Sequence, residues 1–309
     1  MDREMNKIVI VTRRTRLEEL KSRFNTVEQA RFYIEHLGAD FSDYEREDRN
    51  YRSSLAAVFQ AAERAARVQV IERTYLPNMI FGEQDVVIAV GRDGLVANTM
   101  KYLSGQPLIG VNPDAQRWDG ILLPFEPRDM EKLLPAVLDG RYREKSVTMG
   151  AARTRDGQEL YAVNDFFIGV QNHTSARYQI CYNGVTENHS SSGIIVSTGL
   201  GMTGWHRSVM AEFRGMARVF RLGEIREPAY SWDSPALVFQ VREPYPSRFT
   251  QAELVYGEVT AESRLSIVSN MPEGGVIFSD GVPEDSIVFG AGLEVTVAPA
   301  ERTGRLVTG

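Results

Sequence analysis

The feature that most constrains the fold is a strand-like run that leads directly into a glycine turn and a helical pattern. Residues 85–90 read Asp-Val-Val-Ile-Ala-Val, a continuous apolar run that is typical of a strand buried in a parallel sheet. Gly-Arg-Asp-Gly follows at 91–94, and a helical pattern runs from Leu95 to Leu103. A strand that passes straight into a helix in this way favours an α/β fold.

The same alternation continues on both sides of this segment. Further strands are expected at 7–12, 68–71 and 108–111, and helices at 17–20, from Thr26, at 53–68 and at 129–138. Together these elements predict an open parallel sheet. Ligands of such sheets bind beyond the carboxyl ends of the strands, where the turns at Gly91 and Asn112 lie.

The pattern changes in the second half of the chain. Hairpin-type turns, Arg-Asp-Gly-Gln at 155–158 and Asn-Gly at 183–184, separate strand-like runs, and the one long helical pattern there spans 202–220. We therefore expect an N-terminal α/β domain over residues 1–128, a mostly β domain over 129–295 and a C-terminal segment over 296–309.

Composition and charge narrow the class of protein. The 309 residues have a formal net charge of -6, which argues against a nucleic-acid partner because such a protein needs a basic face. Cys181 is the single cysteine, so no intrachain disulfide can form. No stretch approaches the roughly 18 apolar residues of a membrane span, and the acidic start at Met1–Met5 does not resemble a signal peptide. We expect a cytoplasmic protein with no membrane partner.

The turn at 91–94 predicts a phosphate site. The glycines at 91 and 94 permit a positive φ and let a phosphate approach closely, while the N-terminus of the following helix offers free N–H groups. Asp93 would stand at the sheet edge, where a carboxylate can accept a proton from a hydroxyl. The alternative is that Asp93 only caps the helix. Arg13, with Arg14 and Arg16, follows the first strand at the same edge and forms either a phosphate contact or a solvated loop.

These residues also carry a resemblance to a known family. Residues 88–94, Ile-Ala-Val-Gly-Arg-Asp-Gly, resemble the Gly-Gly-Asp-Gly region of the NAD kinase superfamily, which is related to the diacylglycerol and sphingosine kinases. In those enzymes the turn cradles the ATP phosphates and its Asp acts on the acceptor hydroxyl. Residues 108–112 resemble the family's Gly-Val/Ile-Asn strand end. The resemblance implies that Asp93 is catalytic and that ATP phosphates meet Gly91, Arg92, Gly94, Arg13 and Asn112.

Two later segments resemble the family's dinucleotide site. Residues 163–165, Val-Asn-Asp, resemble the Asn-Glu motif that holds the NAD adenosine and ribose. Residues 191–205 resemble the family's Asp-Gly…Ser-Thr-Pro-Thr-Gly-Ser-Thr-Ala-Tyr stretch, and Ser-Asp-Gly at 279–281 resembles a later turn. The implied NAD-binding residues are Asn164, Asp165, Ser192, Thr198, Thr203 and Trp205.

The chain departs from the family pattern at several of these positions. Arg92 replaces the second glycine, Asp165 replaces Glu, Ser192 stands where the family has Asp, and residues 199–200 replace Pro-Thr. The resemblance implies an α/β domain followed by a β-sandwich-like domain in a homo-oligomer. The implied function is phosphorylation of the adenosine 2′-hydroxyl of NAD by ATP with Mg²⁺, with no protein metal ligand identified. Open alternatives are a superfamily kinase for a sugar, nucleotide or lipid hydroxyl, and a non-catalytic nucleotide-binding protein.

One competing motif overlaps the second segment. Residues 199–204 match G-x-G-x-x-G, and Glu224 lies about twenty residues further on, as in dinucleotide-binding βαβ units. A dehydrogenase would need a parallel strand before this motif and a βαβ unit around it. The hairpin-type turns upstream favour antiparallel strands instead, and the chain has no Walker A sequence.

Overall fold

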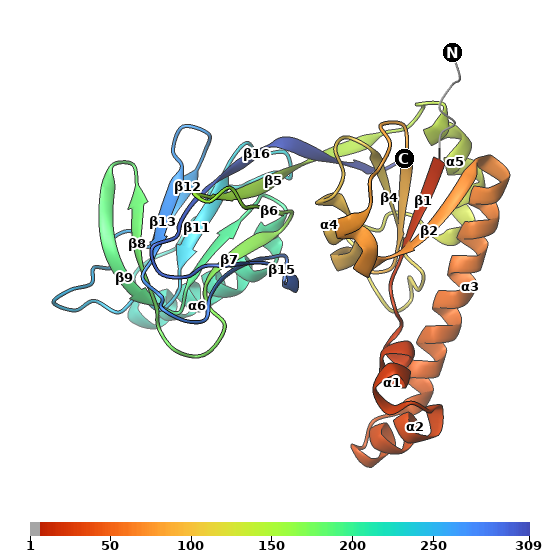
Figure 1. Ribbon diagram of the computed structural model, residues 1–309, viewed down its shortest axis with the longest axis horizontal. Coiled ribbons are helices and arrows are strands. Elements are labelled where there is room, and N and C mark those ends of the chain that lie inside the picture. The colour runs from red at the N-terminus through yellow and green to blue at the C-terminus, as the bar shows by residue number, and fades with distance from the viewer. Residues whose placement is uncertain (1–6) are drawn as a thin grey trace. The chain divides into compact units, whose positions relative to one another are not determined.

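The computed structural model describes residues 7–309, so the signal-peptide prediction for Met1–Met5 lies outside the described residues (Figure 1). The chain divides into two compact units. The first runs to Lys145 and takes in Gly304–Gly309, and the second is Ser146–Thr303. Among the helices described, none is both long enough and apolar enough to cross a bilayer.

The first unit is built on a parallel sheet, as the sequence predicts. Its strands are β1 (Lys7–Thr12), β2 (Arg67–Glu72), β3 (Val86–Val90) and β4 (Pro107–Val111), in the order β2-β1-β3-β4 and all parallel. The register pairs Ile10 with Ile88 and Ile88 with Ile109. All three side chains are fully buried, because helices cover both faces of such a sheet.

The helices of the first unit include one much longer than expected. They are α1 (Arg16–Phe24), α2 (Val27–His36), α3 (Phe41–Ala65), α4 (Asp93–Met100) and α5 (Met130–Leu138), with short 3₁₀ turns η1 (Arg73–Asn78) and η2 (Pro127–Asp129). The helix predicted at 53–68 begins at Phe41, where Asp40 caps it by accepting the Ser42 N–H. Its second half packs on the sheet through Val58 and Ala62, while its first half runs beyond the sheet beside α1 and α2 (Figure 1).

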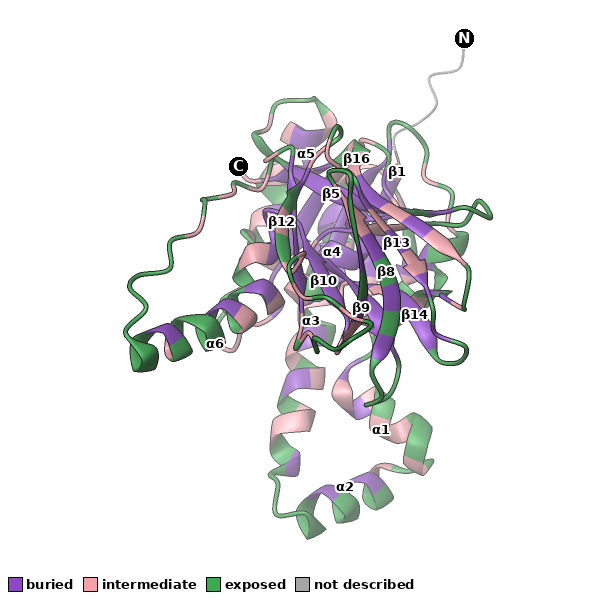
Figure 2. Cartoon of the chain, turned by 90° about the vertical axis from the view of Figure 1, so that its left-hand side faces the viewer, coloured by how far each residue is buried: buried purple, intermediate pink, exposed green. Residues whose placement is uncertain are grey.

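The second unit is a sandwich of two sheets, and this confirms the prediction of a mostly β domain. One sheet contains β5 (Glu144–Thr154), β6 (Glu159–Ala162), β8 (Ala176–Tyr182), β9 (Val185–Ser191), β13 (Leu265–Ser269) and β16 (Glu294–Val307). The other has the order β12-β11-β10-β7-β14-β15, namely Tyr256–Val259, Leu237–Val241, Ile194–Ser197, Asp165–Val170, Gly275–Ser279 and Val282–Val288. Phe166, Tyr178 and Phe239 fill the core of the unit, and Figure 2 shows buried and exposed stretches in turn along β8.

One helix flanks the second sheet. After β10 the chain makes a 3₁₀ turn, η3 (Gly201–Thr203), and then forms α6 (Trp205–Phe220). Its buried residues, His206, Met210 and Ala217, are spaced four and seven apart and so share one side of the helix. The predicted helical pattern at 202–220 is therefore confirmed from Trp205 onward.

The unit boundaries differ from the domain boundaries expected at 128 and 295. Helix α5 belongs to the first unit, because its apolar residues Met130 and Leu134 share a core with Ile8 and Val58. The last residues of β16 also belong there, since Leu306 pairs in parallel with Leu108 of β4. Contacts of this kind join residues far apart in sequence, and local patterns do not report them.

Candidate functional site

The Gly-Arg-Asp-Gly turn lies at the carboxyl end of the central strand β3. The Gly91 N–H donates to the Val111 carbonyl at 3.2 Å, so the turn is tied to the end of β4. Neither Gly91 nor Gly94 has positive φ, so the turn does not use the conformational freedom of glycine. The turn uses instead the space that is left by the missing side chains. A Cβ on Gly91 would press on the Leu95 side chain at 2.8 Å, and a Cβ on Gly94 would meet no atom within 4 Å. The surface over Gly94 is therefore open to a ligand.

Asp93 is the first residue of α4, and its carboxylate points away from the helix backbone. It accepts the Leu122 N–H at 2.7 Å and the Ile121 N–H at 3.3 Å. No side chain caps the helix, so the alternative in which Asp93 acts only as a cap is wrong. The two N–H groups orient the carboxylate and leave lone pairs for a hydroxyl donor. Asp93 lines a cavity of about 350 Å³ together with Trp118 and Gly120.

Asn112 shapes the loop that faces Asp93. Its side-chain amide donates to the Trp118 carbonyl at 2.8 Å, and its oxygen accepts the Asp114 N–H at 3.0 Å. The residue is buried, and both ends of its amide are engaged within the loop. The structure thus brings Asn112 to the predicted edge of the sheet and shows it organising the backbone there. Whether a phosphate contacts it stays a prediction.

A basic cavity lies beside the turn. It has a volume of about 490 Å³ and opens where β1, β2 and β3 end. Ten residues line it: Arg13, Arg14, Arg16, Glu19, Glu72, Arg73, Thr74, Arg92, Gly94 and Leu95. Five are arginines and two are glutamates, so this arginine cavity attracts anions. Arg73 follows β2 and was not recognised from the sequence, because it stands alone in a polar turn.

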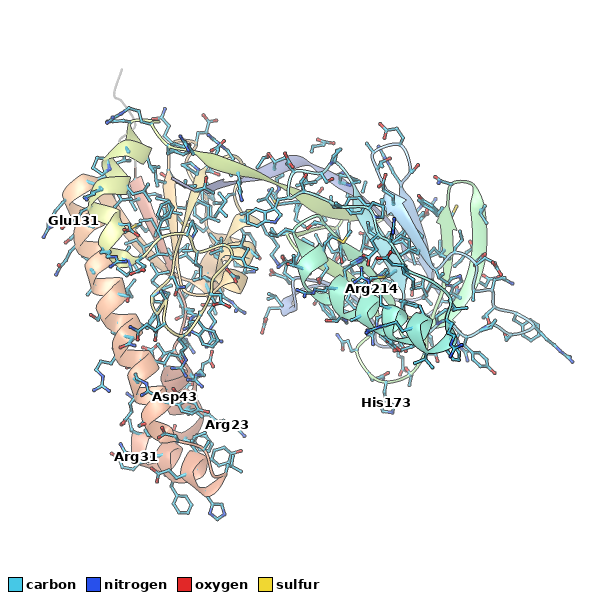
Figure 3. The ribbon with its side chains drawn as sticks, turned by 180° about the vertical axis from the view of Figure 1, so that it is seen from behind. Arg23, Arg31, Asp43, Glu131, His173 and Arg214 are labelled. Atoms are coloured by element: carbon cyan, nitrogen blue, oxygen red, sulfur yellow. The ribbon has the colours of Figure 1, made fainter. Side chains whose placement is uncertain are left out.

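A buried carboxylate on α3 holds two of the arginines that line the arginine cavity. Glu47 is 3% exposed and accepts hydrogen bonds from Arg13 at 2.9 Å and from Arg16. Burial alone would raise the pKa of Glu47, but the hydrogen bonds and charges of Arg16 and Arg13 lower the pKa below its usual range. Asp43, one turn earlier on α3, accepts from Arg16 at 2.8 Å (Figure 3). Glu47 was not predicted, because it lies in a charged stretch without apolar periodicity.

The side chain of Arg92, which replaces the family's second glycine, is positioned by two contacts. Its guanidinium lies 3.9 Å from the centre of the Trp118 ring and 3.6 Å from the Glu47 carboxylate. Burial, followed by the charge of Arg13, lowers the pKa of Arg92, because both disfavour another cation there. The side chain is thus held at the mouth of the turn between two supports.

In the second unit, one carboxylate gathers the residues of the other predicted segment. Asp280 accepts the N–H groups of Val163 at 3.1 Å, Asn164 at 2.6 Å and Asp165 at 3.2 Å. Thr198 closes the arrangement: its N–H donates to the Asn164 carbonyl at 2.9 Å and its hydroxyl donates to the Val163 carbonyl at 2.6 Å. The structure therefore brings Asn164, Asp165 and Thr198 together. The role of Asp280 was missed because it depends on contacts more than a hundred residues apart.

Asp165 is the most perturbed carboxylate of this group. It is 7% exposed, and its carboxylate has no hydrogen-bond partner among residues 7–309. Burial, with a smaller contribution from the Asp280 charge, raises the pKa of Asp165 to about 7. A carboxyl group poised in this way can accept or donate a hydrogen bond near neutral pH.

This raised pKa predicts a measurable pH dependence of stability. Between about pH 4 and pH 7 the folded state binds the Asp165 proton and the unfolded state does not, so the free energy of unfolding falls as pH rises through that window. Asp165→Asn should remove about 2 kcal/mol of that fall between pH 5 and pH 8. Urea unfolding at the two pH values measures it. Equal pH dependence in both proteins would show that Asp165 titrates normally.

The glycine-rich loop after β10 is not a dinucleotide-binding βαβ turn. Strand β10 lies between the antiparallel strands β7 and β11, so the dehydrogenase alternative is wrong. The glycines are explained by close backbone approach. A Cβ on Gly199 would overlap the Ser231 carbonyl oxygen, and a Cβ on Gly201 would overlap that of Asn164.

The aromatic part of the predicted dinucleotide segment is also ordered by stacking. Trp205 stacks on Phe167 with ring centres 5.6 Å apart, and Phe167 stacks in turn on Phe278 at 5.0 Å. The Arg242 guanidinium lies 5.3 Å from the Trp205 ring centre, and the Arg242 carbonyl accepts the Ser192 N–H. Trp205 and Arg242 line a cavity of about 400 Å³. Thr203 is exposed at the start of this region, and its hydroxyl donates to the Leu200 carbonyl at 3.3 Å.

The contacts of His206, next to Trp205, are structural. It is 1% exposed, and its Nε2 lies 2.7 Å from the Glu227 carboxylate, which also pairs with Arg214 (Figure 3). These contacts attach the start of α6 to the segment that follows the helix. The second ring nitrogen, Nδ1, is buried and has no hydrogen-bond partner among the described residues.

Comparisons with known proteins find relatives that are named NAD kinases. NAD kinase from Legionella pneumophila strain Corby is 31% identical over 157 residues, which are 48% of this chain and 52% of that protein. NAD kinase from Burkholderia lata is 29% identical over 142 residues, 42% of this chain and 45% of that protein. The chain is thus similar to NAD kinases over about half of its length. No family model matches it, and the chain matches about half the length of these curated relatives.

Solved NAD kinases share its fold. Yeast NADH kinase in complex with NADH matches with a TM-score of 0.59 at 14% identity, covering 99% of this chain and 84% of that one. An NAD kinase from Archaeoglobus fulgidus in complex with ATP matches with a TM-score of 0.54 at 15% identity, covering 97% and 92%. The predicted α/β domain followed by a β-sandwich-like domain is thereby confirmed.

Proposed function

We propose that this protein is an ATP-dependent kinase that phosphorylates the adenosine 2′-hydroxyl of NAD to give NADP. The observation that supports it most strongly is the Asp93 carboxylate, held by the Leu122 and Ile121 N–H groups beside a cavity lined by five arginines. Proton acceptance and stabilisation of phosphate charge are the two tasks of phosphoryl transfer. The names of the relatives, and the NADH and ATP in the two solved neighbours, support the same substrates.

In this proposal each group of residues has one task. Asp93 accepts the proton of the 2′-hydroxyl as its oxygen attacks the terminal phosphorus of ATP. The Gly91 and Gly94 backbone with Arg92 and Arg13 balances the charge of the phosphates. In the second unit, NAD is held by Asn164, Asp165, Ser192, Thr198, Thr203 and Trp205, among which the Asp165 carboxyl and the Trp205 ring are the groups best placed to contact a ligand. Thr198 acts through the backbone, since its hydroxyl is engaged there.

Mg²⁺ is proposed to act with ATP. Among residues 7–309, no group of three or more His, Cys, Asp or Glu side chains could hold a metal ion. Mg²⁺ is usually held by one or two carboxylates together with water and substrate phosphates. Bound in that way it neutralises phosphate charge, and Arg92 and Arg13 add to that neutralisation from the protein side.

We also propose that the enzyme is cytoplasmic and homo-oligomeric. A single cysteine suits a reducing compartment. The end of α6 and the residues after it expose large apolar side chains, with Val219 77%, Phe220 67% and Leu222 76% exposed. Contiguous apolar surface of this kind is typical of an interface.

The choice of acceptor is tested by offering several hydroxyls at once. Protein, Mg²⁺ and ATP labelled in its terminal phosphate are incubated with NAD, NADH, a hexose, a nucleoside or dispersed diacylglycerol, and the labelled products are separated. We expect label in NAD or NADH only. Label in the hexose, nucleoside or lipid would overturn the proposal, and no transfer to any acceptor would favour a non-catalytic nucleotide-binding protein.

A further inference from the structure

Helix α3 carries four polar side chains at a spacing of four, three and four residues, which places them on one side of the helix. We call them the polar stripe of α3: Asp43, Glu47, Asn50 and Ser54. Each of them contacts a residue of the turn at 91–94 or of the loop that runs from Asn112 to Leu122. The polar stripe therefore joins α3 to the edge of the sheet where Asp93 lies.

Two members of the polar stripe hold the beginning of the loop. The side-chain amide of Asn50 donates to the Asp114 carboxylate at 3.0 Å, and the Ser54 hydroxyl donates to the Pro113 carbonyl at 2.8 Å. Both contacts are partly buried, and they join residues that are 64 and 59 positions apart in the sequence. The start of the loop is thus attached to a long helix by one side-chain contact and one backbone contact.

Asp43 holds the middle of the same loop. Its carboxylate accepts hydrogen bonds from Arg117 of the loop and from Arg16. The hydrogen bond from Arg16, with a smaller contribution from Arg117, holds the pKa of Asp43 well below its usual range, although partial burial opposes this effect. Asp43 is therefore charged at neutral pH, and its ion pair with Arg117 does not depend on small changes of pH.

The end of the loop is what orients Asp93. The Leu122 N–H donates to the Asp93 carboxylate at 2.7 Å and the Ile121 N–H at 3.3 Å. The path from α3 to Asp93 therefore runs through the loop, which α3 holds at 113–117 and which holds the carboxylate at 121–122. A displacement of about 1 Å at a reacting group can cost about 10²-fold in rate, so even a small shift of this loop should slow the reaction.

We propose that Asn50, Ser54 and Asp43 are positioning residues for phosphoryl transfer, because they fix the loop that holds Asp93 in the orientation that receives the proton. This inference rests on the proposed kinase function. The three residues act through the loop and touch no substrate in this account. Their loss should therefore lower kcat and leave the KM values for NAD and ATP nearly unchanged.

Two neighbouring serines of α3 give a matched pair of variants. Ser54→Ala removes the hydrogen bond to the Pro113 carbonyl. Ser53→Ala makes the same chemical change at an exposed residue that has no side-chain partner in the described part of the chain. We expect Ser54→Ala to lower kcat for NADP formation about 3- to 10-fold with both KM values within about twofold of the unmodified protein, and Ser53→Ala to change neither.

The pair of Asn50 and Asp114 permits a rescue experiment. Asn50→Asp brings two carboxylates together, and their repulsion should lower kcat about tenfold or more. Adding Asp114→Asn restores an amide and a carboxylate with their positions exchanged, and kcat should return to within about threefold of the unmodified protein. Melting temperatures should stay within about 4 °C throughout. A purely structural role would instead lower the melting temperature and leave the kcat of the folded protein unchanged.

Hydrogen exchange of residues 112–122, measured by mass spectrometry, separates this inference from the proposed function because it needs no turnover. The segment should exchange about 3- to 10-fold faster in Ser54→Ala and Asn50→Asp, and at an unchanged rate in Ser53→Ala. Equal exchange in all variants, equal kcat in the two serine variants, or no rescue by Asp114→Asn would overturn the inference. Faster exchange in a protein that makes no NADP would leave the support of Asp93 by α3 in place and remove the proposed kinase.

Discussion

Asp93→Asn is expected to lower the turnover of NAD phosphorylation by about 10²–10⁴-fold, the usual contribution of a positioned general base. Asparagine keeps an oxygen that can accept the Leu122 N–H, which Asp93 accepts at 2.7 Å, so the loop over the turn should stay in place. It cannot take the proton of the attacking hydroxyl. Initial rates at saturating NAD and ATP measure the loss, and circular dichroism checks that the fold is kept.

Asp119 is the rival carboxylate for this role. It lines the same cavity as Asp93, is exposed, and has no described hydrogen-bond partner to orient it. We expect Asp119→Asn to change turnover far less than Asp93→Asn does. A large loss in Asp119→Asn with little loss in Asp93→Asn would show that Asp119, and not Asp93, accepts the proton.

The second large effect is expected on stability. Asp280→Ala should lower the free energy of unfolding of the second unit by about 3–4 kcal/mol, because three backbone N–H groups lose a charged acceptor and alanine is strained at positive φ. Asp280 accepts from residues 163–165, and its φ is 54°. Urea unfolding followed by tryptophan fluorescence measures the change. NAD affinity should fall with it, since Asn164 and Asp165 lose their support.

Asp280→Asn separates the two causes. Asparagine tolerates the left-handed backbone and keeps one acceptor oxygen, so we expect it to lose about half as much stability as the alanine variant. If both variants were as stable as the unmodified protein, the hydrogen bonds to residues 163–165 would not be what organises this segment.

Local sequence patterns predicted the elements whose cause is local. The apolar run of β3 and the glycine turn after it, the burial of β1, and the hairpin turns at 155–158 and 183–184 were all read correctly, because each depends on neighbouring residues. The resemblance to the NAD kinases then predicted roles for residues that a strand–turn–helix pattern alone left ambiguous. Asp93 is the clearest case, since a helix cap and a ligand for distant N–H groups look alike in sequence.

What could not be predicted depends on contacts between distant residues. The first half of α3 is charged. Its position is set by packing with α1 and α2 and by ion pairs to Arg13 and Arg16. Glycine at positions 91 and 94 permits a positive φ, whereas the structure uses only the lack of a side chain there. Arg73 reaches the cavity only because β2 ends beside β1.

The most direct test of the account is the formation of NADP itself. Purified protein is incubated with ATP, Mg²⁺ and NAD, and NADP is measured with an NADP-specific dehydrogenase, with Asp93→Asn run alongside. The account predicts steady NADP formation that falls by at least about a hundredfold in the variant. Equal rates in the two proteins, or NADP formation by neither while NAD still raises the melting temperature, would contradict it.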